Sequence, residues 1–179
     1  MANTFLLSKD IMVGKSLVEQ DLVEVAKDIQ TKAVQFNCKL ILPLDVICGK
    51  SIEDREPVEF DINDISKNYM ILDLGTKTTA LINQEIKNSK MVLWNGPVGA
   101  FEYKSYERAT NEIALNIKQN VKQFGINALA GGGDTVSAIK NANAEDGFDY
   151  ISNAGGAFLE WLEGNQSPGV IALRENNLS

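Results

Sequence analysis

The chain alternates between two hydrophobic patterns. Short continuous apolar runs, typical of strands buried on both faces, occupy residues 39–43, 69–75, 90–96, 126–130 and 148–152. Apolar residues at helical spacing of three or four positions occupy 17–36, 78–89, 106–124, 135–142 and 154–164. Residues 56–64 are more polar and predict a short edge element or a loop. Strands separated by helices predict a three-layer α/β fold, a mostly parallel sheet with helices on both faces, in a single domain over residues 1–179.

Composition narrows the chemistry that such a domain can host. The 179 residues include no histidine, which excludes a histidine general base, a Ser-His triad and a His-ligated metal site. The formal net charge of −7 argues against nucleic acid and anionic membranes as partners. The N-terminus lacks the basic region of a signal peptide, and no apolar stretch is long enough to cross a membrane. We therefore expect a cytoplasmic protein.

Two cysteines, Cys38 and Cys48, lie in or beside the apolar run "CKLILPLDVIC". We expect both to be small buried apolar groups in a reducing compartment. The sequence leaves a disulfide between them open.

Two predicted strands end in glycines that precede a predicted helix. They are "ALAGGGDTVSAIK" (128–140) and "YISNAGGA" (150–157). Ligands of parallel sheets bind outside the carboxyl ends of the strands. A helix start leaves about four N–H groups without partners and favours negative charge. Glycines let a phosphate approach these groups, so Gly131, Gly132 and Gly133 predict a phosphate site.

Asp134 and Thr135, which follow these glycines, allow two interpretations. Both residue types cap helices by accepting hydrogen bonds from free N–H groups. Alternatively, Asp134 lies beside a phosphate with a cation between them, and Mg²⁺ suits this arrangement because it takes one or two carboxylates plus phosphate oxygens. The second glycine turn favours a site, since two helix starts can face one polyphosphate. Neither the P-loop motif nor the G-x-G-x-x-G motif is present.

Longer motifs resemble a known family. "VLWNGPVGAFE" (92–102), "GGGDT" (131–135) and "NAGGAFLEWLEG" with "SPGV" resemble the nucleotide-binding C-terminal domain of phosphoglycerate kinase. "ANTFL", "VGKSLVEQDL" and "LDLGTKT" resemble the same family in the same order, so the resemblance covers nearly the whole chain. It implies that the N-terminal domain, which binds 3-phosphoglycerate, is absent here. The resemblance likewise implies that the first strand–helix unit of the nucleotide domain, with its phosphate-binding lysines, is absent.

The resemblance implies a phosphate-binding end of the site. Asp134 would approach the metal of Mg-ATP. The phosphates would be held by Gly132, Gly133 and Thr135, with Asn95 near them.

It also implies a base-binding end. Leu72 would lie against the adenine, although alone it is most simply a core strand residue. Pro97 and Val98 would shape the nucleotide cleft. Glu102 would accept hydrogen bonds from the ribose hydroxyls, although alone it reads as a solvated surface glutamate.

The implied reaction moves a phosphoryl group between 1,3-bisphosphoglycerate and ADP, in either direction. Gly155 and Gly156 would present helix N–H groups to the phosphoryl group in flight. No general base is required, because the nucleophile in the ATP-consuming direction is a carboxylate. No lysine or arginine occurs in either glycine turn. We therefore expect the isolated chain to bind nucleotide without catalysing the transfer.

Two departures and two alternatives accompany this hypothesis. Thr76 stands where the family usually has proline, and Asn153-Ala154 where many members have Thr-Gly. The chain could instead be a non-catalytic nucleotide-binding or interaction module, or an unrelated phosphosugar-binding α/β domain. The missing strand–helix unit predicts self-association through an exposed sheet edge.

Overall fold

The computed structural model describes residues 1–153, 155–164 and 171–172. Its α-helices are α1 (Ala2–Leu7), α2 (Val23–Gln35), α3 (Thr76–Asn88), α4 (Arg108–Phe124), α5 (Gly133–Asn141) and α6 (Gly155–Leu162). Its strands are β1 (Asp45–Gly49), β2 (Val58–Asp61), β3 (Met70–Leu74), β4 (Met91–Trp94), β5 (Asn127–Gly131) and β6 (Tyr150–Ser152). Three short 3₁₀ helices are Gln20–Leu22, Lys104–Tyr106 and Glu145–Gly147. Ala154 and the "SPGV" motif lie outside the described residues.

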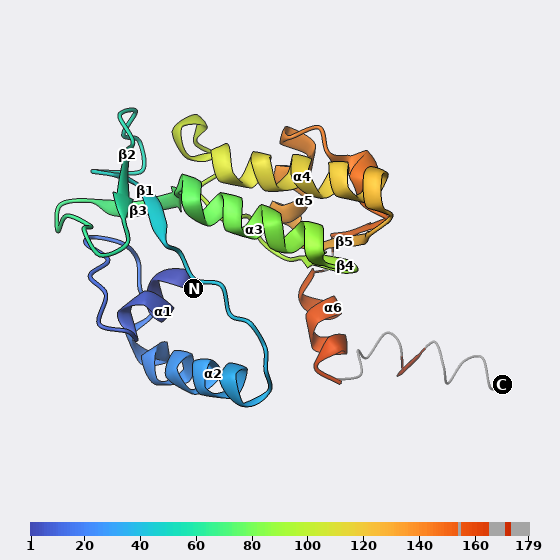
Figure 1. The fold of residues 1–179 in the computed structure, drawn as a ribbon, viewed down its shortest axis with the longest axis horizontal. Coiled ribbons are helices and arrows are strands. Elements are labelled where there is room, and N and C mark those ends of the chain that lie inside the picture. Colours follow the sequence, from blue (N-terminus) through green and yellow to red (C-terminus); the bar gives the residue numbers. More distant parts are fainter. Residues whose placement is uncertain (154, 165–170, 173–179) are drawn as a thin grey trace.

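The described strands form two three-stranded sheets (Figure 1). One is parallel, with the order β4-β5-β6. The other is antiparallel, with the order β2-β1-β3, and places β2 at an edge. The parallel sheet with its helices confirms the α/β fold class, and β2 confirms the edge element expected over 56–64. The antiparallel pairing of β1 with β3 is a feature that the run of apolar strands did not predict.

Helices lie on both faces of the parallel sheet but cover one face more fully than the other. α3 and α4 lie side by side on one face, and α6 descends from the other (Figure 1). The buried core beneath α4 includes Trp94, Ile113 and Ile117. The predicted apolar face of α4 is confirmed at Ala109, Ile113 and Ile117, which are buried. Gly125 ends this helix in the left-handed conformation with a φ of 65°, which costs glycine little.

The other face of the parallel sheet is only partly covered at β4. Side chains alternate along a strand, so Trp94 points into the core while Met91 and Leu93 point away from it. Met91 is 58% exposed and Leu93 is 39% exposed. Among the described strands, β4 pairs with β5 alone and lies at the edge of the sheet, where backbone groups can lack strand partners.

The prediction of a strand at residues 39–43 is wrong. This run is extended coil, and the strand begins two residues later, at β1. No described strand lies beside 39–43 to pair with it, and Pro43 lacks an N–H group. Within the run, Lys39 forms an ion pair with Glu85 of α3. Backbone hydrogen bonds to α3 begin at Leu44 and Asp45, whose N–H groups donate to the Thr78 hydroxyl. The sequence also gave no reason to expect α1.

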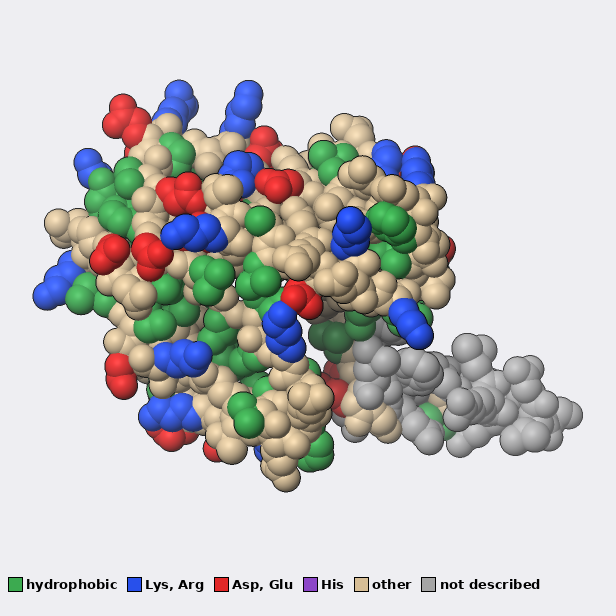
Figure 2. Space-filling model, viewed as in Figure 1, with side chains coloured by type: hydrophobic (Ala, Val, Ile, Leu, Met, Phe, Trp, Pro, Cys, Tyr) green, Lys and Arg blue, Asp and Glu red, His purple; other side chains and the backbone are tan. Residues whose placement is uncertain are grey.

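The predicted helix over 17–36 is confirmed from Val23 onward, yet its apolar face lies at the surface. Val25, Ile29 and Phe36 are exposed, and Ala26 is the residue of α2 that is buried. Figure 2 shows hydrophobic side chains gathered on the surface along the segment that leads from α2 to β1. No described helix is long and apolar enough to cross a membrane.

The cysteines have different environments. Cys48 is buried as expected, and burial raises the pKa of its thiol to about 12. Cys38 is exposed, so the expectation that it is buried is wrong. It directly precedes residues 39–43, which form no strand. Both cysteines are free.

Candidate functional site

The two glycine turns meet at the carboxyl edge of the parallel sheet. β5 leads through Gly131 and Gly132 into α5, and β6 leads towards Gly155 at the start of α6. The turns are in direct contact, because a Cβ on Gly155 would lie 2.5 Å from Gly132 N and 2.7 Å from Asn95 Oδ1. Gly132 adopts a φ of 101°, which glycine reaches without strain. The structure therefore brings Asn95, Gly132 and Gly155 together.

Thr135 joins this edge to the loop after β4. Its hydroxyl accepts a hydrogen bond of 2.7 Å from the N–H of Gly96. Thr135 is almost fully buried, so this bond is shielded from water. The hydroxyl hydrogen can still be donated, and the bond to Gly96 fixes the start of the Pro97–Ala100 loop against α5.

Gly133 and Gly156 lie at the surface. A Cβ on either residue would meet no atom within 4 Å, and both residues are exposed. Asp134 is exposed in the first turn of α5. The described residues contain no cluster of three or more His, Cys, Asp or Glu that could hold a metal ion. A cation beside Asp134 would take most of its ligands from phosphate and water.

A second part of the site is an apolar cavity of about 490 Å³. Leu72 of β3 and Pro97 and Val98 of the loop lie together in its lining, as does the start of α1. The Ala100 N–H donates to the Leu72 carbonyl at 2.8 Å and holds the loop against β3. The predicted base-binding residues Leu72, Pro97 and Val98 thus share one cavity.

Glu102 lies apart from this cavity. It is exposed and lines a separate, polar hollow of about 930 Å³ with Asp54, Arg55 and Lys104. The structure does not bring Glu102 to the glycine turns or into the lining of the apolar cavity. Of the predicted site residues, it is the one placed in a different hollow.

Two buried aspartates that support the site were missed from the sequence. Asp73 follows Leu72 and accepts hydrogen bonds from the N–H groups of Leu74 and Ala109, at the start of α4. Asp45 likewise accepts hydrogen bonds from N–H groups at the start of α3. Their signal was a carboxylate inside an otherwise apolar run, "PLDVI" and "ILDLG", since aspartate is seldom buried without a partner.

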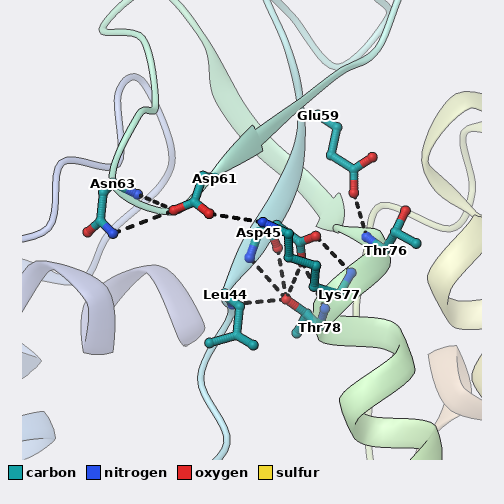
Figure 3. A network of polar contacts seen from close by, with 8 residues as sticks. All are labelled: Leu44, Asp45, Glu59, Asp61, Asn63, Thr76, Lys77 and Thr78. Atoms are coloured by element: carbon teal, nitrogen blue, oxygen red, sulfur yellow. Dashed lines mark hydrogen bonds and ion pairs between the residues drawn. The ribbon is translucent and has the colours of Figure 1, made fainter.

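Figure 3 shows how Asp45 anchors α3. Its carboxylate accepts from the Lys77 N–H at 2.8 Å, the Thr78 N–H at 2.8 Å and the Thr78 hydroxyl at 2.6 Å. Burial opposes ionisation, but these hydrogen bonds outweigh it and hold the pKa of Asp45 below its ordinary value. Nearby, Asp61 forms an exposed ion pair with Lys77, and Glu59 accepts from the Thr76 N–H at 2.6 Å. α3 is thus fixed to the antiparallel sheet at its first turn.

The arrangement as a whole defines an α/β domain whose two glycine turns meet at the carboxyl edge of its parallel sheet. The family of phosphoglycerate kinase matches residues 1–165, and the chain belongs to this family. A phosphoglycerate kinase of Cereibacter sphaeroides is 45% identical over 174 residues, which are 97% of this chain and 44% of the relative. That of Zymomonas mobilis is 42% identical over 174 residues, with the same coverage. The chain therefore spans less than half the length of these relatives.

Solved structures show the same likeness. The phosphoglycerate kinase of Coxiella burnetii superposes with a TM-score of 0.86 at 35% identity, covering 92% of this chain and 42% of the other. That of Pyrococcus horikoshii superposes with a TM-score of 0.77 at 25% identity, covering 97% and 43%. The glycine turns and the apolar cavity thus belong to a fold that these enzymes share.

Proposed function

We propose that this chain is the ADP- and ATP-binding part of a phosphoglycerate kinase. The whole enzyme would transfer a phosphoryl group between 1,3-bisphosphoglycerate and ADP, giving 3-phosphoglycerate and ATP, as a glycolytic step in the cytoplasm. The domain-sized match to phosphoglycerate kinases supports this assignment.

One observation carries the proposal: the loop from Asn95 to Ala100 connects the two parts of the site. Its first residue lies against Gly132 and Gly155, and its end lies against Leu72. A nucleotide laid along this loop would have its phosphates at the helix starts of α5 and α6 and its base in the apolar cavity. Aligned N–H groups suit the phosphates, and apolar walls suit the base. Glu102, in the neighbouring hollow, would reach the ribose only if the nucleotide extends towards it.

The residues at the carboxyl edge fit Mg²⁺ bound together with the nucleotide. Asp134 is a single exposed carboxylate at a helix start, and Mg²⁺ in nucleotide sites takes one or two carboxylates with phosphate oxygens. The ion would neutralise phosphate charge. Without it, the Asp134 carboxylate would repel the phosphates that the helix starts attract.

The chain's own groups would act by position and charge. Gly155 and Gly156 would offer N–H groups of α6 to the transferred phosphoryl group, and Gly132, Gly133 and Thr135 would hold the remaining phosphates. Phosphoryl transfer depends on such positioning and on electrostatic stabilisation. A carboxylate nucleophile is already ionised, so the absence of histidine is compatible with the reaction.

We further propose that the 179-residue polypeptide alone binds nucleotide without turnover. Its glycine turns contain no lysine or arginine, and positioning of the second substrate contributes about 7–11 kcal/mol to such reactions. A coupled assay on material free of host enzyme tests this. Turnover of about 1–100 per second, the usual range for kinases, would refute it.

Calorimetric titration with ADP, with and without Mg²⁺, tests the site itself. Asp134→Ala should remove most of the Mg²⁺ dependence of binding, because it removes the carboxylate that the ion offsets. If Asp134 is only a helix cap, the variant would instead lose about 1 kcal/mol of stability and bind Mg-ADP unchanged.

Self-association is also part of the proposal. The unpaired edge of β4, the exposed Met91 and Leu93, and the exposed apolar face of α2 all invite contact with another surface. Light scattering at high concentration should detect dimers or larger species. A strictly monomeric chain would contradict this part.

A further inference from the structure

Asp73 is a buried carboxylate that none of the roles above uses. It is 1% exposed and borders the apolar cavity next to Leu72. Its Oδ1 accepts from the Leu74 N–H at 2.9 Å, and its Oδ2 accepts from the Ala109 N–H at 3.0 Å. Because Ala109 belongs to the first turn of α4, the carboxylate fastens the start of this helix to β3.

The first turn of α4 in turn holds the loop that walls the cavity. The hydroxyl of the fully buried Thr110 accepts from the N–H groups of Val98 and Gly99, each at 3.3 Å. The loop also packs directly on the carboxylate, since a Cβ on Gly99 would lie 2.7 Å from Asp73 Cγ. Asp73 therefore contacts the loop itself and the helix that holds it.

We propose that Asp73 is a positioning residue for the nucleotide, and that its carboxylate keeps the Pro97–Ala100 loop where it accepts the base. The inference rests on the proposed nucleotide site and adds one residue to it. The ionised side chain accepts both N–H groups at once. A protonated carboxyl has one oxygen that carries a hydrogen, so the bond to Ala109 or to Leu74 is weakened. Uptake of one proton would therefore loosen the start of α4 and the loop that Thr110 holds.

The surroundings place this titration near neutral pH. Burial is the largest influence and raises the pKa of Asp73 to about 6. Hydrogen bonds from the Ala109 and Leu74 N–H groups and the charge of Arg108 lower this pKa, and the charge of Glu112 raises it. Arg108 itself donates to the Leu74 carbonyl and pairs with Glu112.

Other charged or titratable groups near Asp73 are engaged elsewhere. The carboxylate of Asp45 on β1 is turned to the start of α3, and the Tyr106 hydroxyl donates to the Asp54 carbonyl. A carboxylate kept ionised in a cavity wall at a cost in stability is typical of a functional position.

Linkage fixes the sign of the effect. If the nucleotide favours the ionised form, its affinity falls as pH falls through about 6, by at most tenfold per pH unit for a single proton. With a pKa of about 6, we expect Mg-ADP to bind the wild-type chain up to about fourfold more weakly at pH 5.5 than at pH 7.5, beyond the change caused by ionisation of ADP itself.

The experiment is a calorimetric titration with Mg-ADP between pH 5.5 and 7.5. Asp73→Asn cannot ionise and should lose this fourfold component. Asp64→Asn, a substitution at an exposed aspartate, is the matched control and should keep it. Ionisation of ADP is common to all three proteins, so the difference isolates Asp73. Equal pH profiles for wild type and Asp73→Asn would overturn the proposal.

A second readout needs neither nucleotide nor a well-folded Asp73 variant. In NMR spectra of the nucleotide-free chain, the amides of Val98, Gly99 and Ala109 should follow one titration near pH 6. Thr110→Val should reduce the response of Val98 and Gly99 to that titration, since only the direct contact of the loop with Asp73 remains, and Thr110→Ser, which keeps the hydroxyl, should restore it.

Val98 and Gly99 amides that do not titrate in the wild type would overturn the proposal. If the amides titrate but Mg-ADP binds at no pH, the nucleotide site itself is refuted, and with it the role of Asp73 in binding.

Discussion

Replacing Asp45 tests whether α3 is anchored as the structure indicates. Asp45→Ala removes the acceptor of the Lys77 and Thr78 N–H groups and of the Thr78 hydroxyl, in a site where Asp45 is 2% exposed. Loss of a helix cap costs about 1 kcal/mol, and a hydrogen bond to a buried charged group contributes about 1.5–3 kcal/mol. Relief of the buried charge offsets part of this loss. We expect the free energy of unfolding to fall by about 2–4 kcal/mol, a large part of the 5–15 kcal/mol typical of a domain.

Urea denaturation followed by circular dichroism measures this change. Asp61→Ala is the matched control, because Asp61 lies at the same helix start but its ion pair with Lys77 is exposed (Figure 3). Exposed ion pairs contribute little, so the control should be nearly neutral. Equal losses in the two variants would refute the buried anchor.

The pH dependence of Asp45 has a definite sign. The pKa of Asp45 is lower in the folded than in the unfolded chain. Its contribution to the free energy of unfolding is therefore fully present at a pH above the unfolded-state pKa of about 4. This stabilising contribution is lost as the pH falls through the folded-state pKa of Asp45. The stability gap between wild type and Asp45→Asn should therefore narrow below about pH 4. A gap independent of pH would contradict this account.

Three further predictions concern the site. Gly155→Ala places a Cβ 2.5 Å from Gly132 N, so it should lower stability by about 1–3 kcal/mol and weaken ADP binding. Gly156→Ala, whose Cβ would lie in open space, should have neither effect. Melting curves compare the stabilities of the two variants, and calorimetry compares their ADP affinities. Glu102→Ala should weaken ADP more than its 2′,3′-dideoxy analogue if Glu102 reaches the ribose, and equal losses would return it to a surface role. Asp73, with its pKa raised to about 6, should make wild-type stability fall by about 3 kcal/mol as pH rises from about 4 through 6, and Asp73→Asn should lack this fall in urea denaturation.

Local patterns predicted the parallel half of the fold well. β4, β5 and β6 are short apolar runs, and α4 has a continuous apolar face at Ala109, Ile113 and Ile117. Each of these signals depends on a few neighbouring residues. The glycines that precede α5 and α6 were visible for the same reason.

The features that could not be predicted from the sequence depend on contacts between residues far apart in the chain. Residues 39–43 have the composition of a strand, but a strand exists only where a neighbour pairs with it. The helical spacing of apolar residues predicted α2 but not which element would cover its apolar face, and Val25 and Ile29 are exposed. The anchoring roles of Asp45 and Asp73 depend on residues some 30 positions away, Thr78 and Ala109.

Amide chemical shifts during titration with Mg-ADP test the central claim most directly. The account predicts that Asn95–Ala100, Gly132–Thr135 and Gly155–Gly156 shift together with Leu72, with one dissociation constant, while α2 does not respond. Shifts confined to α2, or no shifts at all, would contradict a nucleotide site that runs along the loop from the glycine turns to the apolar cavity.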